Sequence, residues 1–126
     1  MPRKSGSIGV LETISISKNK KDAVSKYLEI LQEKYLDKIE NVILFGSAAR
    51  GESDKESDVD ILVVLKKRDE KLRDEVSMAA FDVILSSNVV ISPIVMNKEM
   101  YEWHKWYRDP LYNNIERDGI DLWMKS

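Results

Sequence analysis

Apolar residues recur at spacings of three and four in several stretches of this chain, which predicts amphipathic helices. The first stripe predicts a helix over residues 21–36, and the second predicts one over residues 69–86. The two stripes consist of Val24, Tyr27, Leu28, Leu31 and Tyr35, and of Leu72, Val76, Ala79, Ala80, Val83 and Ile84. An aromatic-rich helix is predicted over residues 98–108, where Asp109-Pro110 ends it. A short helix, closed by Asp118-Gly119, is expected within residues 111–123.

Three apolar segments between these helices have the character of strands, at residues 42–45, 58–65 and 89–96. In the middle segment, side chains on alternate positions are predicted to lie on opposite faces of a sheet, with Asp58 and Asp60 on the same face. Pro93 removes one backbone donor from the third segment, which predicts a sheet edge or a bulge there. The order of elements predicts an α/β (α+β) fold in which helices pack on a small sheet.

Length and composition restrict the class of protein. A chain of 126 residues suits one domain with its own core. With no cysteine and one histidine, the sequence excludes a disulfide framework, thiol catalysis and metal sites built from Cys or several His. Its apolar runs are too short to span a bilayer, and Met1–Val10 lacks the apolar core of an export signal. We therefore expect a cytoplasmic protein without a membrane partner.

Charge is distributed unevenly along the sequence. Residues 1–21 carry a net charge of +4, although the whole chain has a formal charge of −2. We divide the chain into a basic N-terminal arm, residues 1–21, and a domain over residues 22–126. The arm could contact nucleic acid or an acidic partner, but a solvated terminus is the simpler interpretation. The overall negative charge argues against nucleic acid as the main partner.

The segment 42–65 contains a pattern with chemical meaning: Gly46-Ser47, ten residues, Asp58, one residue and Asp60. Gly46 permits close approach to the backbone, and the Ser47 hydroxyl can donate to a phosphate oxygen. A helical turn starting here would present unpaired N–H groups, which suit a phosphate. A Gly-Ser pair alone is usually only a turn, so its weight depends on the acids that follow.

Two carboxylates on one face of a strand suit Mg²⁺, which prefers oxygen ligands. Without a cation, Asp58 and Asp60 would repel each other. A triphosphate held by Gly46-Ser47 would supply further Mg²⁺ ligands, so the two parts of the pattern explain each other. Such an acid pair can also be a solvated strand edge. The complete spacing arises by chance in a chain of this length with a probability on the order of 10⁻³, which favours function.

This pattern, with Arg50-Gly51 and Ser57 inside it, resembles the signature of the minimal nucleotidyltransferases of the polymerase-β superfold. The resemblance implies a mixed sheet flanked by helices, with a nucleoside triphosphate and Mg²⁺ at its open end. It also implies transfer of a nucleotidyl group to a hydroxyl, with release of pyrophosphate. By position, the resemblance assigns triphosphate binding to Gly46, Ser47 and Arg50. It assigns metal binding and catalysis to Asp58 and Asp60.

One departure from the family pattern concerns the third strand. The family commonly places a third carboxylate there, which completes the catalytic metal site. No acid lies between Asp82 and Glu99 in this chain, and by register Ser92 takes the expected position. A hydroxyl is a weaker metal ligand than a carboxylate, and it is not a base at neutral pH.

Two functions remain open at this point. The first is Mg²⁺-dependent transfer of a nucleotidyl group, AMP from ATP, to a hydroxyl on a partner. Many minimal relatives are the antitoxin of a toxin–antitoxin pair, which implies a small helical protein as the partner. The second is a catalytically weak or inactive module that binds nucleotide and partner, which the absence of a third carboxylate favours. The sequence does not determine which nucleotide base is used or whether the protein forms a homo-oligomer.

Overall fold

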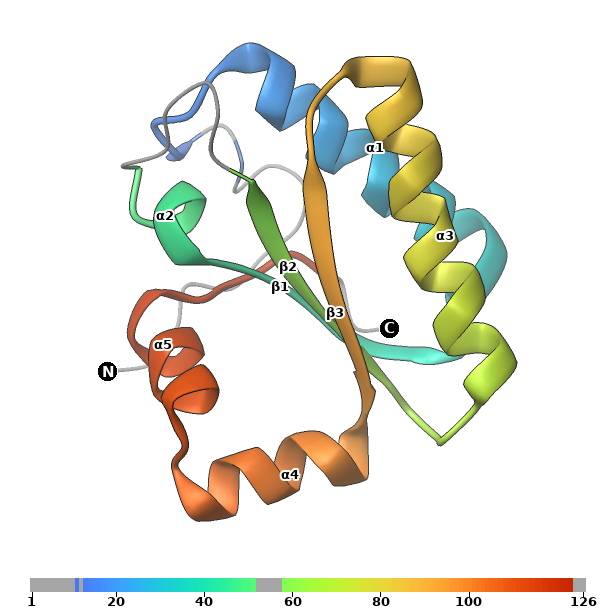
Figure 1. Cartoon of the computed structure of the whole chain (residues 1–126), viewed down its shortest axis with the longest axis vertical. Coiled ribbons are helices and arrows are strands. Elements are labelled where there is room, and N and C mark those ends of the chain that lie inside the picture. Colours follow the sequence, from blue (N-terminus) through green and yellow to red (C-terminus); the bar gives the residue numbers. More distant parts are fainter. Residues whose placement is uncertain (1–10, 12, 52–57, 124–126) are drawn as a thin grey trace.

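The computed structural model describes residues 11, 13–51 and 58–123, which form a four-stranded sheet with helices on both faces (Figure 1). The strands lie in the order β3-β2-β1-β4. Strand β1 is antiparallel to β2 and to β4, and β2 is parallel to β3, so the predicted mixed sheet is confirmed. In chain order, the elements are α1 (Lys18–Tyr35), β1 (Ile39–Phe45), α2 (Gly46–Ala49), β2 (Val59–Leu65), α3 (Glu70–Ser87), β3 (Ile91–Asn97), α4 (Lys98–Tyr107), α5 (Pro110–Asp118) and β4 (Ile120–Asp121).

The alternation predicted for β2 divides the core into two parts. Val59, Ile61 and Val63 join the larger cluster, to which α1 and α3 contribute their apolar stripes. Leu62 and Val64 belong to the smaller cluster on the opposite face, which includes residues of α5 and, at its margin, of α4. The sheet is therefore buried on both sides, because each face of β2 has its own helices to pack against.

Helices α1 and α3 are joined by packing and by one buried hydrogen bond. The Tyr27 hydroxyl donates to the Val76 carbonyl oxygen over 2.9 Å, and Tyr27 is fully buried. Burial, followed by the nearby Tyr35, raises the pKa of Tyr27 well above its usual value. None of the helices within residues 11, 13–51 and 58–123 has both the length and the apolar character needed to cross a membrane.

Strand β3 lies at the edge of the sheet, as Pro93 predicts. Strand β1 begins at Ile39, earlier than the sequence predicts, because Asn41 does not interrupt it. The register of β1 against β2 shifts between Ile39 and Asn41, which is a bulge or similar irregularity. The Asn41 carboxamide is satisfied there: its oxygen accepts from the Val42 backbone N–H over 2.9 Å, and its nitrogen donates to Asp121 over 3.3 Å.

The N-terminal arm is only partly separate from the domain. Helix α1 begins at Lys18 because Ser17 caps it, with its side chain accepting from the backbone N–H of Lys20 over 3.3 Å. The predicted boundary at residue 21 thus falls inside a helix. Leu11 and Ile14 are buried in the larger core cluster. Residues 1–10 and 12, the rest of the predicted arm, lie outside the described residues.

The C-terminal segment contains the predicted short helix, which ends at Asp118-Gly119 as expected, and then a strand that was not predicted. Helix α5 starts with Asp109 as its N-cap and Pro110 in its first turn, and it ends before Gly119. The chain then forms β4, which pairs with Ile43 and Leu44 of β1. The sequence signal was the alternation from Ile120 to Leu122, but it is too short to identify a strand without its partner.

We expect Leu11→Ala to lower the free energy of unfolding by about 2–5 kcal/mol, the usual cost of a cavity at a buried leucine. Leu85→Ala is the matched control, because Leu85 is 70% exposed and Leu11 is 1% exposed. Urea denaturation of the wild type and both variants measures the difference. Equal stability of the two variants would contradict the packing of Leu11 into the core.

Candidate active site

The contact between Gly46 and Asp60 lies at the centre of the site. Gly46 follows the last residue of β1 and has a φ of 76°, a conformation that favours glycine. An idealised Cβ at this position would lie 2.4 Å from Asp60 Oδ2. Any side chain here would therefore displace the carboxylate. The absence of a Cβ at Gly46 lets the Asp60 carboxylate lie directly against the backbone.

Helix α2 turns the chain sharply after β1. Its four residues include Ala48, which is fully buried and anchors the turn in the larger core cluster. The backbone N–H of Arg50 donates to the Gly46 carbonyl over 3.3 Å, and that of Gly51 donates to the Ala48 carbonyl over 3.2 Å. Ser47 is half-buried in this turn, next to Gly46. The helical turn that the sequence predicts after Gly46-Ser47 is thus present.

The two acids of the pattern lie at the start of β2. Asp58 is exposed just before the strand, and Asp60 is the half-buried second residue of the strand, opposite Phe45 of β1. Partial burial, and then the charge of Asp58, raise the pKa of the Asp60 carboxyl above its usual value. Two anionic groups are therefore held close together, in an arrangement that a cation would stabilise.

Ser92 lies beside Asp60 on the neighbouring strand. The parallel register of β2 and β3 pairs the Cα atoms of Asp60 and Ser92. Paired residues of adjacent strands project to the same face of a sheet, so the hydroxyl belongs to the same region as the acid. Ser92 is thus the neighbour of Asp60 in the strand register, and its place as the substitute for a third carboxylate stays a prediction. A hydroxyl therefore stands where a third carboxylate would reinforce the pair.

The donor set fits a divalent cation only in part. Asp58 and Asp60 could contribute two carboxylate ligands, and Asp60 Oδ2 lies directly against the Gly46 backbone. Over the described ranges 11, 13–51 and 58–123, no group of three or more His, Cys, Asp or Glu side chains is arranged to hold a metal. A Mg²⁺ ion at the pair would thus need most of its ligands from water or from phosphate oxygens.

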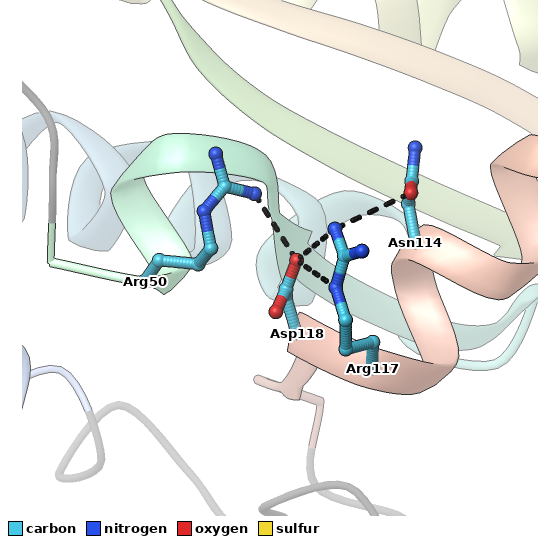
Figure 2. A network of polar contacts seen from close by, with 4 residues as sticks. All are labelled: Arg50, Asn114, Arg117 and Asp118. Carbon is cyan, nitrogen blue, oxygen red and sulfur yellow. Dashed lines mark hydrogen bonds and ion pairs between the residues drawn. The ribbon is translucent and has the colours of Figure 1, made fainter.

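Arg50 belongs to a polar network that joins α2 to α5 (Figure 2). Its Nη1 donates to Asp118 Oδ2 over 3.1 Å, and Arg117 Nε and Nη2 donate to the same oxygen over 3.0 and 2.9 Å. Arg117 Nη2 also lies 3.4 Å from Asn114 Oδ1. Sequence reasoning missed Arg117 and Asp118, because 68 residues separate Arg50 from Asp118 along the chain. No local pattern could reveal their contact.

The structure thus brings four of the selected residues together at one end of the sheet. Gly46 contacts Asp60, Ser47 follows Gly46 in the α2 turn, and Ser92 pairs with Asp60 in the strand register. Asp58 directly precedes β2 beside this group. The Arg50 side chain extends from the end of α2 toward α5 (Figure 2). Ser57, the remaining member of the pattern, lies outside the described residues.

Comparison with known proteins identifies the fold. The crystal structure of a toxin–antitoxin with AMP-PNP superposes with a TM-score of 0.55 and 21% sequence identity, over 81% of this chain and 73% of the other. That of a mutant MntA–HpeT toxin–antitoxin superposes with a TM-score of 0.53 and 20% identity, over 82% and 73%. At these identities, the likeness supports a shared fold.

Two relatives found by sequence have a higher identity to this chain than these solved structures. Two proteins of Methanocaldococcus jannaschii carry the provisional name protein adenylyltransferase. MJ0141 is 38% identical over 113 residues, which are 89% of this chain and 100% of the relative. MJ0604 is 36% identical over 105 residues, which are 83% and 99%. The profile of a family described as a nucleotidyltransferase domain matches residues 24–121. The chain therefore belongs to the nucleotidyltransferase domain family, as one of its minimal nucleotidyltransferases.

Proposed function

We propose that this protein transfers AMP from ATP to a hydroxyl group of a partner protein, in a reaction that depends on Mg²⁺. The observation that carries the proposal is the contact of the Asp60 carboxylate with the Gly46 backbone. This contact places an acid pair beside a turn that contains Ser47, which is the arrangement expected for a metal–triphosphate site. The adenylyltransferase names of the relatives and the AMP-PNP in a structural neighbour support ATP as the nucleotide.

Each residue has a defined part in this proposal. Gly46 and Ser47 hold the triphosphate, Arg50 contacts a phosphate, and Asp58 and Asp60 hold Mg²⁺. When bound, the cation neutralises phosphate charge and polarises the phosphate that is attacked. The acceptor oxygen forms a bond to the α-phosphorus while the bond from that phosphorus to the pyrophosphate oxygen breaks. The hydroxyl proton is lost to solvent, and pyrophosphate leaves.

The proposed acceptor is a small helical protein, with this chain as the antitoxin of a toxin–antitoxin pair. Two of the solved neighbours are toxin–antitoxin structures, which supports a protein partner without identifying it. That the protein is cytoplasmic and that it forms a homo-oligomer are predictions from the sequence.

A second candidate function rests on Ser92. Because a hydroxyl pairs with Asp60 where a third carboxylate would complete a two-metal site, turnover could be slow or absent. The protein would then bind nucleotide and partner without efficient transfer. The acid pair argues against a module that bound only a partner, since such a module would have no use for two adjacent carboxylates beside a glycine turn; it fits both the enzyme and the nucleotide-binding module.

We expect the double variant Asp58→Asn/Asp60→Asn to lose Mg²⁺-dependent binding of ATP. The substitutions remove both anionic ligands and nearly preserve side-chain volume, so the fold should survive. Isothermal titration calorimetry with ATP and Mg²⁺ measures the loss. Asp74→Asn/Asp82→Asn is the matched control, because both acids are exposed on α3 and the charge change is the same. Unchanged affinity of the Asp58/Asp60 variant would refute the metal site.

Ser47→Ala should weaken ATP binding by about tenfold or more. The variant keeps the α2 backbone but deletes one hydroxyl donor to a charged phosphate, a hydrogen bond of about 1.5–3 kcal/mol. Titration with ATP and Mg²⁺ measures the affinity, and thermal unfolding without ligand should show little change. If the melting temperature falls strongly while the affinity does not, Ser47 has a structural role.

Ser92→Asp distinguishes the enzyme from the binding module. A third negative charge beside Asp60 should destabilise the protein in EDTA, and Mg²⁺ with ATP should restore its stability. The variant should also speed AMP transfer to a supplied acceptor. Thermal unfolding in both conditions gives the sign of the effect, with Ser77→Asp on α3 as the control. A change that Mg²⁺ and ATP do not relieve would show that residue 92 does not face the metal. Brisk transfer by the wild type would rule out the binding module.

A further inference from the structure

The Asp118 carboxylate connects the proposed triphosphate site to α5. Its side chain is only 10% exposed, and its Oδ2 accepts from the guanidinium groups of Arg50 and Arg117 (Figure 2). Hydrogen bonds from Arg117, partly opposed by burial, and then those from Arg50 lower the pKa of Asp118 below its usual value. Asp118 therefore stays ionised at neutral pH as the shared counter-ion of two arginines.

Asp118 is held in place from both sides along the chain. Ile115, one turn earlier in α5, is fully buried among Ile43, Phe45, Leu62 and Val64 of the sheet. The Gly119 backbone N–H donates to the Ile115 carbonyl over 2.6 Å, and β4 begins immediately afterwards and pairs with β1. The carboxylate therefore stands on an anchored helix end, and its position is set by the same strand that leads to Gly46.

Arg50 is less constrained. It follows the last residue of α2, and its side chain is 36% exposed. A long side chain at such a position samples many rotamers, and ordering it costs conformational entropy. The hydrogen bond to an anchored carboxylate restricts that freedom before a nucleotide arrives. The hydrogen bond and the charge of Asp118 raise the pKa of Arg117, and they outweigh the opposing effects of burial and of the Arg50 charge.

We propose that Asp118 is a positioning residue of the triphosphate site, which holds Arg50 at the end of α2 so that its guanidinium is oriented for phosphate. This inference rests on the proposed function, because it requires Arg50 to contact the nucleotide. Asp118 itself carries a negative charge and would repel a triphosphate. Its contribution to ATP binding therefore passes through Arg50.

This arrangement gives the experiment a diagnostic sign. If Asp118 acted only as a charge, Asp118→Asn would strengthen binding of the anionic nucleotide. A positioning role predicts the opposite: we expect Asp118→Asn to weaken ATP–Mg²⁺ binding by about fivefold, within the coupling range of residues in direct contact. Asp118→Glu retains the anion on a longer side chain and should restore most of the lost affinity.

A double-mutant cycle with Arg50→Ala tests the route of the effect. Affinity for ATP–Mg²⁺ is measured by calorimetry for the wild type, for each single variant and for the double variant, and melting temperatures are measured without nucleotide. In the Arg50→Ala background, Asp118→Asn should cause no further loss of affinity. Asp121→Asn is the charge-matched control, because Asp121 lies three residues later and accepts from Asn41.

The outcomes separate this inference from the proposed function. Failure of the wild type to bind ATP–Mg²⁺ would overturn both. The positioning role alone would be overturned if the wild type binds ATP–Mg²⁺ and Arg50→Ala weakens that binding, but Asp118→Asn leaves it unchanged or strengthens it. An equal loss from Asp118→Asn with and without Arg50 would also overturn it, because Asp118 would then act independently of that side chain. If Asp118→Asn does not fold, Asp118→Ala takes its place in the cycle: a loss of ATP–Mg²⁺ affinity that vanishes in the Arg50→Ala background supports the role, and a loss that persists there overturns it.

Discussion

The packing of the Asp60 carboxylate on the Gly46 backbone is the constraint on which the site depends. β1 and β2 are antiparallel neighbours, so the end of one strand lies next to the start of the other, and a glycine there brings an acid against a chain turn. A Cβ at position 46 would meet the acid at 2.4 Å. The buried strands on either side make this region rigid, because both faces of β2 are covered by helices. The fold thus supplies a fixed frame for an otherwise repulsive arrangement of charges.

Charge balance governs the rest of the site. Asp58 and Asp60 concentrate negative charge on one side of α2, and Arg50 extends from the other end of the same short helix toward Asp118 and Arg117. Anionic and cationic groups are thus separated by a single helical turn. A metal–triphosphate complex carries charges of both signs and is complementary to such a pattern, whereas a free anion or a free cation would satisfy only half of it. Ser92, which pairs with Asp60 in the strand register, adds a hydroxyl and no charge to the anionic side.

The sequence predicted those features that follow from local periodicity or from fixed spacing. The alternation of β2 correctly divided its residues between two faces, and Pro93 correctly indicated an edge strand. Features that depend on distant partners were missed. β4 needs the free edge of β1 to be recognisable as a strand, and the bulge at Asn41 is stabilised partly by Asp121. The sequence predicted the start of α1 too late, at residue 21, because residues 1–21 were interpreted as a basic arm and the N-cap Ser17 lies among them.

The same distinction explains why Asp118 did not stand out in the sequence although it touches the site pattern. Asp118-Gly119 is a typical helix end, and nothing near it suggests a nucleotide. Its role arises because β4 returns the chain to β1, the strand that ends at Gly46, so that the last residue of α5 reaches the end of α2. The short strand β4 is therefore more than an addition to the sheet edge. By pairing with β1, it places the counter-ion for Arg50, and the geometry of the cationic side of the site depends on this pairing.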